Sequence, residues 1–218
     1  SLAVEILIDN CVKNNLPVER ILKAVLLLEN AHRQIYEGQF LDVKFEEMNV
    51  DDVTEEMYLD MIEYTTGFQM SAYAQVGALL AGCTEQNLKS LKDYGFYTGT
   101  IFQIRDDFID YINSEEDIGK PPFQDFMHKK KRLPILLALK SSNRKERELL
   151  TKLLGKSALT DEDKSDFIEI VTKEEVIDYS RKLIEQLKEK AIVCLNNLNP
   201  PAGIRAVLNE ILELASDL

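Results

Sequence analysis

The sequence predicts an all-α protein, and three observations point to this class. Glycine and proline, which interrupt helices, number only 9 and 6 among 218 residues. Apolar residues recur at helical spacing through most of the chain. No segment keeps for long the alternation of apolar and polar residues that is typical of a strand. We therefore expect one helical domain over residues 1–218, with 45% apolar residues to supply its core.

The first half of the chain predicts three helices. The apolar pattern is already helical at the first residues and indicates a helix over 2–14, then a second from about 17 to 37. Gly38 is where we expect this second helix to stop. Thr54 is suited to cap the next helix, which extends to about residue 82. That helix is apolar on nearly every side, which is typical of a helix buried in a larger helical body.

The second half continues the helical pattern. Thr84 is the predicted cap of a long helix to about residue 113, which carries one apolar stripe and one stripe of small and polar residues. Residues 113–131 hold two prolines and a basic run, and predict a loop. Further helices are expected at 133–139, 143–155, 160–171, 174–197 and 202–217. The predicted core face of the 174–197 helix consists of Val176, Tyr179, Leu183, Leu187, Ala191 and Leu195.

Charge and cysteine content argue against several classes of partner and location. Lys and Arg number 26 against 38 Asp and Glu, so the formal net charge is −12, which disfavours nucleic acid or an anionic membrane as the main partner. No apolar run approaches the roughly 20 residues of a membrane-spanning helix. The three cysteines form no CxxC pair and fit reduced thiols, so we expect a cytoplasmic protein without an integral membrane segment.

An acidic turn within the predicted helix at 84–113 is the strongest candidate site. Asp106, Asp107 and Asp110 share one helix face, since positions i, i+1 and i+4 are neighbours. Three carboxylates on one turn repel one another unless a cation neutralises them, and hard oxygen donors suit Mg²⁺, whose shell phosphate oxygens can complete. The alternative is a solvated acidic face. The opposite face is apolar, however, and glycine and glutamine, not lysines, continue the stripe, which favours a metal site.

A basic segment follows the acidic turn. It contains Lys120 and, from residue 128, the run HKKKR. Cations placed shortly after a metal-binding turn can fold back and hold the same phosphate group. The alternatives are a solvated loop or a nucleic-acid patch, and the net charge disfavours the latter. The acidic residues at 51–56 are interpreted as helix capping, and GQFLD at 38–42, taken alone, as a helix stop.

Taken together, four motifs resemble those of the trans-isoprenyl diphosphate synthases, the family of farnesyl and geranylgeranyl diphosphate synthases. GQFLD at 38–42 is similar to the family's GQxxD, and TTG at 65–67 stands where the family has KTG. FQIRDDFID at 102–110 resembles its second aspartate-rich motif. GKPPFQDFMHKKKRLPILLAL at 119–139 resembles its GKPxGxDxxxGKxTLPxxxAL segment. The resemblance covers essentially the whole chain.

The resemblance implies a helical bundle around a central cavity and a Mg²⁺-dependent prenyl transfer. In such enzymes an allylic diphosphate loses its diphosphate, and isopentenyl diphosphate attacks the resulting cation. The implied metal ligands are Asp106, Asp107 and Asp110, and the implied catalytic residues are Asp106, Asp107 and Lys120. The residues implied to contact or support substrate diphosphate are Gln39, Asp42, Gln103, Lys120, Asp125 and Lys130. Family members usually form homodimers.

The chain also departs from the family pattern. It contains neither the first aspartate-rich motif nor the arginine pair that follows it, and we expect the N-terminal helices that carry them to be missing. Thr65 stands in place of a diphosphate-binding lysine, Lys129 in place of a glycine and Arg132 in place of a threonine. We therefore expect weak or no activity from the chain alone. It would be a piece of a longer synthase, a subunit completed by a partner, or a degenerate paralogue or relative with another prenyl acceptor.

Two other functions remain open at this point. The chain can be a non-catalytic subunit that binds a complete synthase through the apolar faces of residues 20–36 and 54–82. A terpene cyclase is a third possibility, although the GKP…LP segment fits the synthases better.

Overall fold

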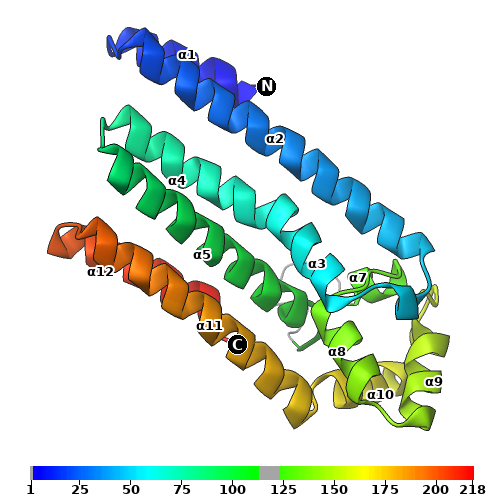
Figure 1. Cartoon of the computed structure of the whole chain (residues 1–218). Coiled ribbons are helices and arrows are strands. Elements are labelled where there is room, and N and C mark those ends of the chain that lie inside the picture. The colour runs from blue at the N-terminus through cyan, green and yellow to red at the C-terminus, as the bar shows by residue number, and fades with distance from the viewer. Residues whose placement is uncertain (1, 113–122) are drawn as a thin grey trace.

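The computed structural model describes residues 2–112 and 123–218 (Figure 1). Within these residues every regular element is a helix, which confirms the predicted all-α class. In chain order the elements are α1 (Leu2–Lys13), α2 (Val18–Glu47), a 3-10 turn η1 (Val50–Asp52), α3 (Glu55–Ile62), a π-helical turn η2 (Glu63–Gly67), α4 (Phe68–Leu80), α5 (Glu85–Ile112), α7 (Gln124–Met127), α8 (Leu133–Ser141), α9 (Arg144–Leu153), α10 (Asp161–Val171), α11 (Glu174–Leu198) and α12 (Ala202–Ser216).

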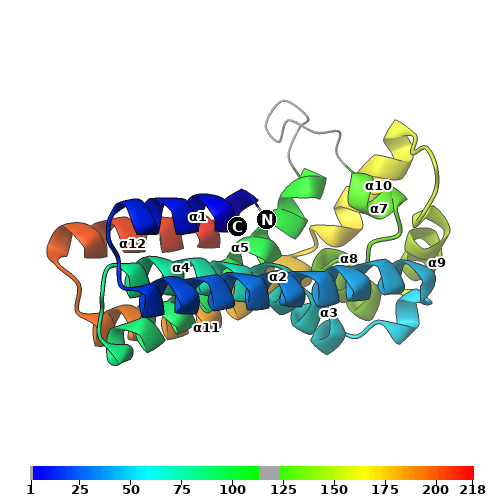
Figure 2. The same cartoon turned by 90° about the horizontal axis from the view of Figure 1, so that it is seen from above.

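The long helices form a layered bundle with α5 near its centre. α5 packs against α4 on one side and α11 on the other, and α2 packs against α4. The layers therefore run α2, α4, α5 and α11, with α12 beside α11 (Figure 1). The short helices α7 to α10 gather at one end of this bundle, as Figure 2 also shows.

The apolar stripe predicted on α5 lies in the main core. Ile101, Ile104 and Phe108 are almost completely buried, and each such side chain contributes roughly 1.5–3 kcal/mol by burial. Phe167 of α10 packs in the same core, with its ring centroid 4.2 Å from that of Phe126 in α7. The core thus fixes α5 from one side, and the acidic turn on its other side is held in a defined place.

Several predicted helix starts are confirmed by their caps. The Thr54 hydroxyl accepts a hydrogen bond from the Met57 N–H at 3.2 Å, and the Thr84 hydroxyl accepts one from the Asn87 N–H at 3.3 Å. α9 and α10 each begin with a reciprocal capping box. These bonds satisfy N–H groups that the first turn of a helix otherwise leaves unpaired.

The predicted helix stop at Gly38 is wrong, because α2 continues through it to Glu47. The glycine serves close packing instead. A Cβ atom at residue 38 would lie 2.7 Å from Thr65 Cγ2 and 2.9 Å from the Thr65 backbone nitrogen. The single helix predicted over 54–82 is also interrupted, since η2 separates α3 from α4.

Two further expectations need correction. Tyr179 does not lie on the core face of α11, since 41% of it is exposed, and Ile184 is buried there instead. α4 is only partly covered, because Met70 and Tyr73 are exposed. The loop predicted over 113–131 contains the short helix α7, and its part at 113–122 lies outside the described residues.

Two simpler expectations can be compared with the described residues directly. Cys11, Cys83 and Cys194 are free thiols, as predicted. In the part of the chain that the structure describes, no helix has the length and apolar character needed to cross a membrane.

Candidate functional site

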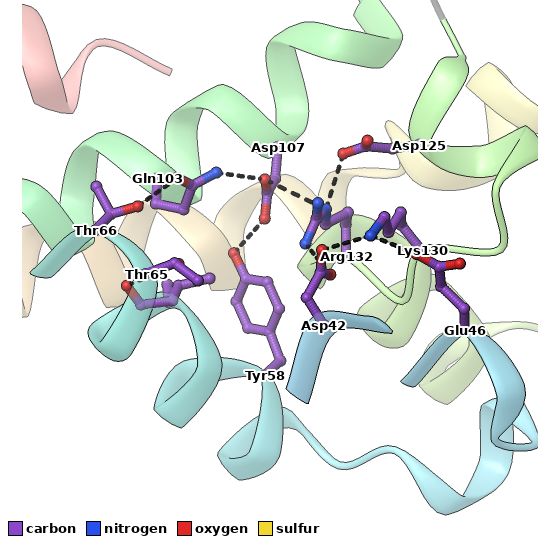
Figure 3. Close-up of polar contacts among 11 residues, drawn as sticks. Asp42, Glu46, Tyr58, Thr65, Thr66, Gln103, Asp107, Asp125, Lys130 and Arg132 are labelled. Atoms are coloured by element: carbon purple, nitrogen blue, oxygen red, sulfur yellow. Dashed lines mark hydrogen bonds and ion pairs between the residues drawn. The ribbon is translucent and has the colours of Figure 1, made fainter. Parts of the chain in front are cut away.

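The acidic turn of α5 lies beside a group of buried and half-buried polar side chains that come from several elements (Figure 3). We call this group the polar cluster. It consists of Asp42 and Glu46 of α2, Tyr58 of α3, Thr66 of η2, Gln103 and Asp107 of α5, Asp125 of α7, and Lys130 and Arg132 of the segment between α7 and α8. Residues far apart in the sequence therefore meet at one place.

Asp107 is the most deeply buried acid of the polar cluster, with 2% of its surface exposed. The Tyr58 hydroxyl donates to its Oδ2 at 2.6 Å, and the Gln103 Nε2 donates to its Oδ1 at 2.9 Å. The Thr66 hydroxyl in turn donates to Gln103 Oε1 at 2.7 Å, which orients the amide toward Asp107. Burial raises the pKa of Asp107 to about 6, against the opposing effects of Arg132 and the two hydrogen bonds.

Arg132 is a cation shared by three carboxylates. Its Nε lies 2.8 Å from Asp125 Oδ2 and 3.7 Å from Asp107 Oδ1, and its Nη1 lies 2.9 Å from Asp42 Oδ1. Only 12% of the side chain is exposed. Burial alone would lower the pKa of this guanidinium, but the three carboxylates outweigh it and raise the pKa, so that Arg132 stays charged.

Lys130, the predicted substrate lysine, is held by two carboxylates of α2. Its Nζ lies 2.5 Å from Asp42 Oδ2 and 2.5 Å from Glu46 Oε1. Burial opposes the charge, but hydrogen bonds to these two acids raise the pKa of Lys130. The neighbouring Lys131 donates to the backbone carbonyl of Glu46 at 2.9 Å, which ties the same segment to the end of α2.

The three acids of the predicted metal motif have different surroundings. Asp107 is engaged in the polar cluster, and the Asp110 side chain is buried. Asp106 is half-exposed, and within residues 2–112 and 123–218 its side chain has no hydrogen bond or ion pair. No three His, Cys, Asp or Glu side chains among the described residues are arranged to hold a metal ion by themselves. A Mg²⁺ ion does not need three, because it keeps waters and binds through one or two carboxylates plus phosphate oxygens.

Some of the other predicted site residues lie in the polar cluster, and others do not. Asp42, Gln103, Asp125 and Lys130 all belong to the polar cluster. Gln39 is exposed on α2, one turn before Asp42, and is not among the contacts of the cluster. Lys120 lies outside the described residues.

The sequence prediction missed Tyr58, Thr66 and Glu46. It placed Arg132 in the basic run that can hold a phosphate group and noted it as a departure from the family pattern, but it assigned no partner to this residue. A signal existed for Tyr58, since a tyrosine on the buried side of a helix usually brings its hydroxyl to a polar partner. A signal existed for Arg132 as well, since it directly precedes the apolar run of α8. The position of the Thr66 side chain depends on the π-helical turn of η2, and the spacing of apolar residues in the sequence does not reveal such a turn.

The chain is similar in sequence to known proteins over much of its length. The sequence model of the polyprenyl synthetase family matches residues 1–171. The chain is 32% identical over 189 residues to a geranylgeranyl diphosphate synthase of Sulfolobus acidocaldarius, covering 87% of this chain and 56% of that protein. It is 38% identical over 137 residues to a short chain isoprenyl diphosphate synthase of Methanothermobacter thermautotrophicus, covering 63% of this chain and 42% of that protein. The chain thus spans about half the length of these curated relatives.

Solved structures share the fold. A polyprenyl synthase from Caulobacter crescentus, crystallised with calcium and isoprenyl diphosphate, superposes with a TM-score of 0.83 at 30% identity. The alignment covers 92% of this chain and 61% of that one. A geranylgeranyl pyrophosphate synthetase from Pyrococcus horikoshii superposes with a TM-score of 0.80 at 28% identity, over 93% and 61% of the two chains. The sequence model of the polyprenyl synthetase family matches most of this chain, from residue 1 to 171, and the chain therefore belongs to that family.

Proposed function

We propose that the chain is the diphosphate-handling part of a prenyltransferase that condenses an allylic diphosphate with isopentenyl diphosphate. One observation carries the proposal. The acidic turn of α5 lies against a cluster in which the cations Lys130 and Arg132 are brought to Asp107 and Asp42 from a distant segment. The names of the curated relatives support the same reaction, although the chain spans only about half of their length.

The proposed chemistry assigns different tasks to the acids. Mg²⁺, when bound, neutralises the negative charge that grows on a departing diphosphate. Asp106 is the half-exposed carboxylate with no partner among the described residues, so we propose it as a protein ligand of the ion. Asp110 is proposed to join it from the next turn of the helix. Asp107 holds the amide of Gln103 in a fixed orientation, so the Gln103 side chain is positioned beside the motif.

Lys130 is proposed to serve the diphosphate by exchanging partners. In the structure its ammonium group is neutralised by Asp42 and Glu46. A diphosphate carries more charge than either carboxylate and offers several acceptor oxygens, so it can compete for the same donor. Asp42 and Asp125 then remain paired with Arg132, which keeps the segment before α8 in place.

The test is Mg²⁺-dependent binding of an allylic diphosphate, because binding is measured separately from the condensation that follows it. Titration calorimetry with a non-reactive thiolodiphosphate analogue should show binding that EDTA abolishes and that Asp106→Ala weakens about tenfold or more. Asp9→Ala, an exposed acid of α1, is the matched control and should bind as the wild type does. Binding unaffected by both EDTA and Asp106→Ala would remove the proposed role. Radiolabelled isopentenyl diphosphate added in parallel measures any elongation.

Assembly and location belong to the same proposal. Leu22, Leu26, Tyr36 and Phe40 are large apolar side chains exposed along α2, and an exposed apolar surface of this kind favours assembly. We propose a homodimer, which sedimentation equilibrium would measure, in the cytoplasm, where the three free thiols would stay reduced. The non-catalytic subunit is the less favoured alternative, since the curated relatives are named as synthases.

A further inference from the structure

Lys131, the lysine next to Lys130, lies inside the fold with only 3% of its surface exposed. Its Nζ donates to the backbone carbonyl of Glu46 at 2.9 Å, which is the one hydrogen bond that this side chain makes within residues 2–112 and 123–218. The motif GKxTLP, which this stretch resembles, leaves the position of Lys131 open. The role of this residue therefore has to be found from its contact with α2.

The Glu46 carbonyl lies in the last turn of α2, where a helix has no N–H donors of its own for its carbonyl groups. Many helices supply such donors through a left-handed turn after the last residue, but Met48 continues in an extended conformation, with φ −74° and ψ 153°. Lys131 brings a donor from 85 positions further along the chain. Its positive charge also lies at the negative end of the helix dipole. The ammonium group therefore acts as a C-terminal cap of α2.

A gain in stability does not explain why a lysine occupies this place. Burial lowers the pKa of Lys131, and the charge of Lys129 lowers it further, against the opposing effect of Glu46. Since a lowered pKa means that the charged form is less favourable here than in water, the cap only partly offsets the burial of the ammonium group. What the contact achieves is a fixed position for the backbone that carries Lys130 and Arg132 on either side.

We propose that Lys131 is a positioning residue that keeps residues 130–132 attached to α2 while Lys130 exchanges its partners. The inference rests on the proposed function, in which a diphosphate takes the Lys130 ammonium group from Asp42 and Glu46 (Figure 3). That exchange breaks two contacts between this segment and α2. The contact made by Lys131 survives, because its ammonium group is buried and its acceptor is a backbone carbonyl that stays in the helix.

Amide hydrogen exchange of the full chain tests this, read by mass spectrometry for a peptide that covers residues 42–48. Wild type, Lys131→Met and Lys131→Arg are compared with and without Mg²⁺ and the thiolodiphosphate analogue. Without the analogue, Lys131→Met should exchange about threefold or more faster than the wild type, because its side chain has a similar length but no donor. The analogue should speed exchange further in this variant, since the Arg132 pair with Asp42 then holds the segment one turn before the helix end. Wild type and Lys131→Arg should show no such acceleration.

Lys152→Met is the control, because Lys152 is an exposed lysine in the last turn of another helix, α9, and it should exchange as the wild type does. Two results would overturn the proposal: an exchange rate that Lys131→Met leaves unchanged, or an equal effect of the analogue on this variant and the wild type. If the wild type binds no analogue, the proposed function fails, and exchange without the analogue still shows whether Lys131 caps α2.

If Lys131→Met does not fold, the wild type decides. Its exchange at residues 42–48 should not become faster when Mg²⁺ and the analogue bind, because Lys131 keeps the helix end in place. Faster exchange in the bound state would mean that the segment detaches together with Lys130, contrary to the proposal.

Discussion

Replacing Tyr58 by phenylalanine should lower the free energy of unfolding by about 2 kcal/mol. Tyr58 is 0% exposed, and its hydroxyl donates to Asp107 Oδ2 at 2.6 Å. The substitution removes one oxygen atom and leaves a buried carboxylate without that donor, at a place where water is not available to replace it. A hydrogen bond to a charged group contributes about 1.5–3 kcal/mol. For a chain of this length, a loss of about 2 kcal/mol lowers the melting temperature by roughly 4–8 °C.

A double-mutant cycle in urea separates this hydrogen bond from general packing. Unfolding is followed by circular dichroism for the wild type, Tyr58→Phe, Asp107→Asn and the double variant, and the coupling between the two sites should be about 1 kcal/mol. Tyr179→Phe is the matched control, because its hydroxyl also donates to a carboxylate, Glu55, at 2.6 Å but on the exposed surface. Its loss should stay within about 0.5 kcal/mol. A Tyr58→Phe effect no larger than that of the control, or a coupling of zero, would refute the buried hydrogen bond.

Three other predictions concern the fold around the site. Gly38→Ala should destabilise the chain by about 1–3 kcal/mol. The new Cβ would lie 2.9 Å from the Thr65 backbone nitrogen, which cannot move aside as a flexible side chain can. Gly203→Ala, with open space around it, is the control in the same thermal melt. Phe167→Ala should cost about 3–5 kcal/mol in urea unfolding, since this fully buried ring packs on Tyr111, Phe123 and Phe126, whereas Phe102→Ala, at an exposed position, should cost much less. The hydrogen bonds from Lys156 and from the Thr160 N–H hold the pKa of Asp163 at about 2, below the ordinary value of 3.8. The contribution of Asp163 to stability is therefore complete above pH 3.8 and is lost as the pH falls toward 2. Carbon-detected NMR should find this low titration midpoint, and Lys156→Gln should raise it. An Asp163 midpoint that Lys156→Gln leaves unchanged would contradict the assignment.

Helix positions were predictable because they depend on local signals. Thr54 and Thr84 were expected as caps, and both accept the hydrogen bond that defines a cap. The end of α2 was predicted wrongly for a reason that no local signal contains. Gly38 is small because Thr65, 27 positions further along the chain, packs against it. Glycine is found both at helix ends and where two helices pack closely, and only the tertiary arrangement shows which role a given glycine has.

The candidate site was predictable in part, through the motifs. The resemblance selected Asp42, Gln103, Asp125 and Lys130, and the structure places all four in the polar cluster that contains Asp107. It gave no geometry for a position that departs from the pattern. Arg132 stands where the pattern has threonine, so its contacts had to come from the coordinates. The expectation that the three motif acids act together as metal ligands stays a prediction, since their burial and partners differ.

The position of Arg132 links the stability of the fold to the chemistry of the site. Arg132 is the last extended residue before α8, and Leu133 follows it directly into the core with no exposed surface. Every residue of α8 from Leu133 to Leu139 is buried, and burial of each leucine or isoleucine side chain among them contributes roughly 1.5–3 kcal/mol. Burial of this apolar helix therefore fixes the position of the guanidinium among the acids. The free energy gained by that burial offsets the cost of removing the charge from water. A substitution that loosens α8, such as Ile135→Ala, should consequently weaken the Arg132 contacts with Asp42 and Asp125 although it touches no charged group. Faster exchange of the Arg132 Nε–H in that variant, compared with one in which an exposed residue such as Lys140 is replaced by alanine, would show the connection. Equal exchange rates in both would mean that the ion pairs hold Arg132 without help from the core.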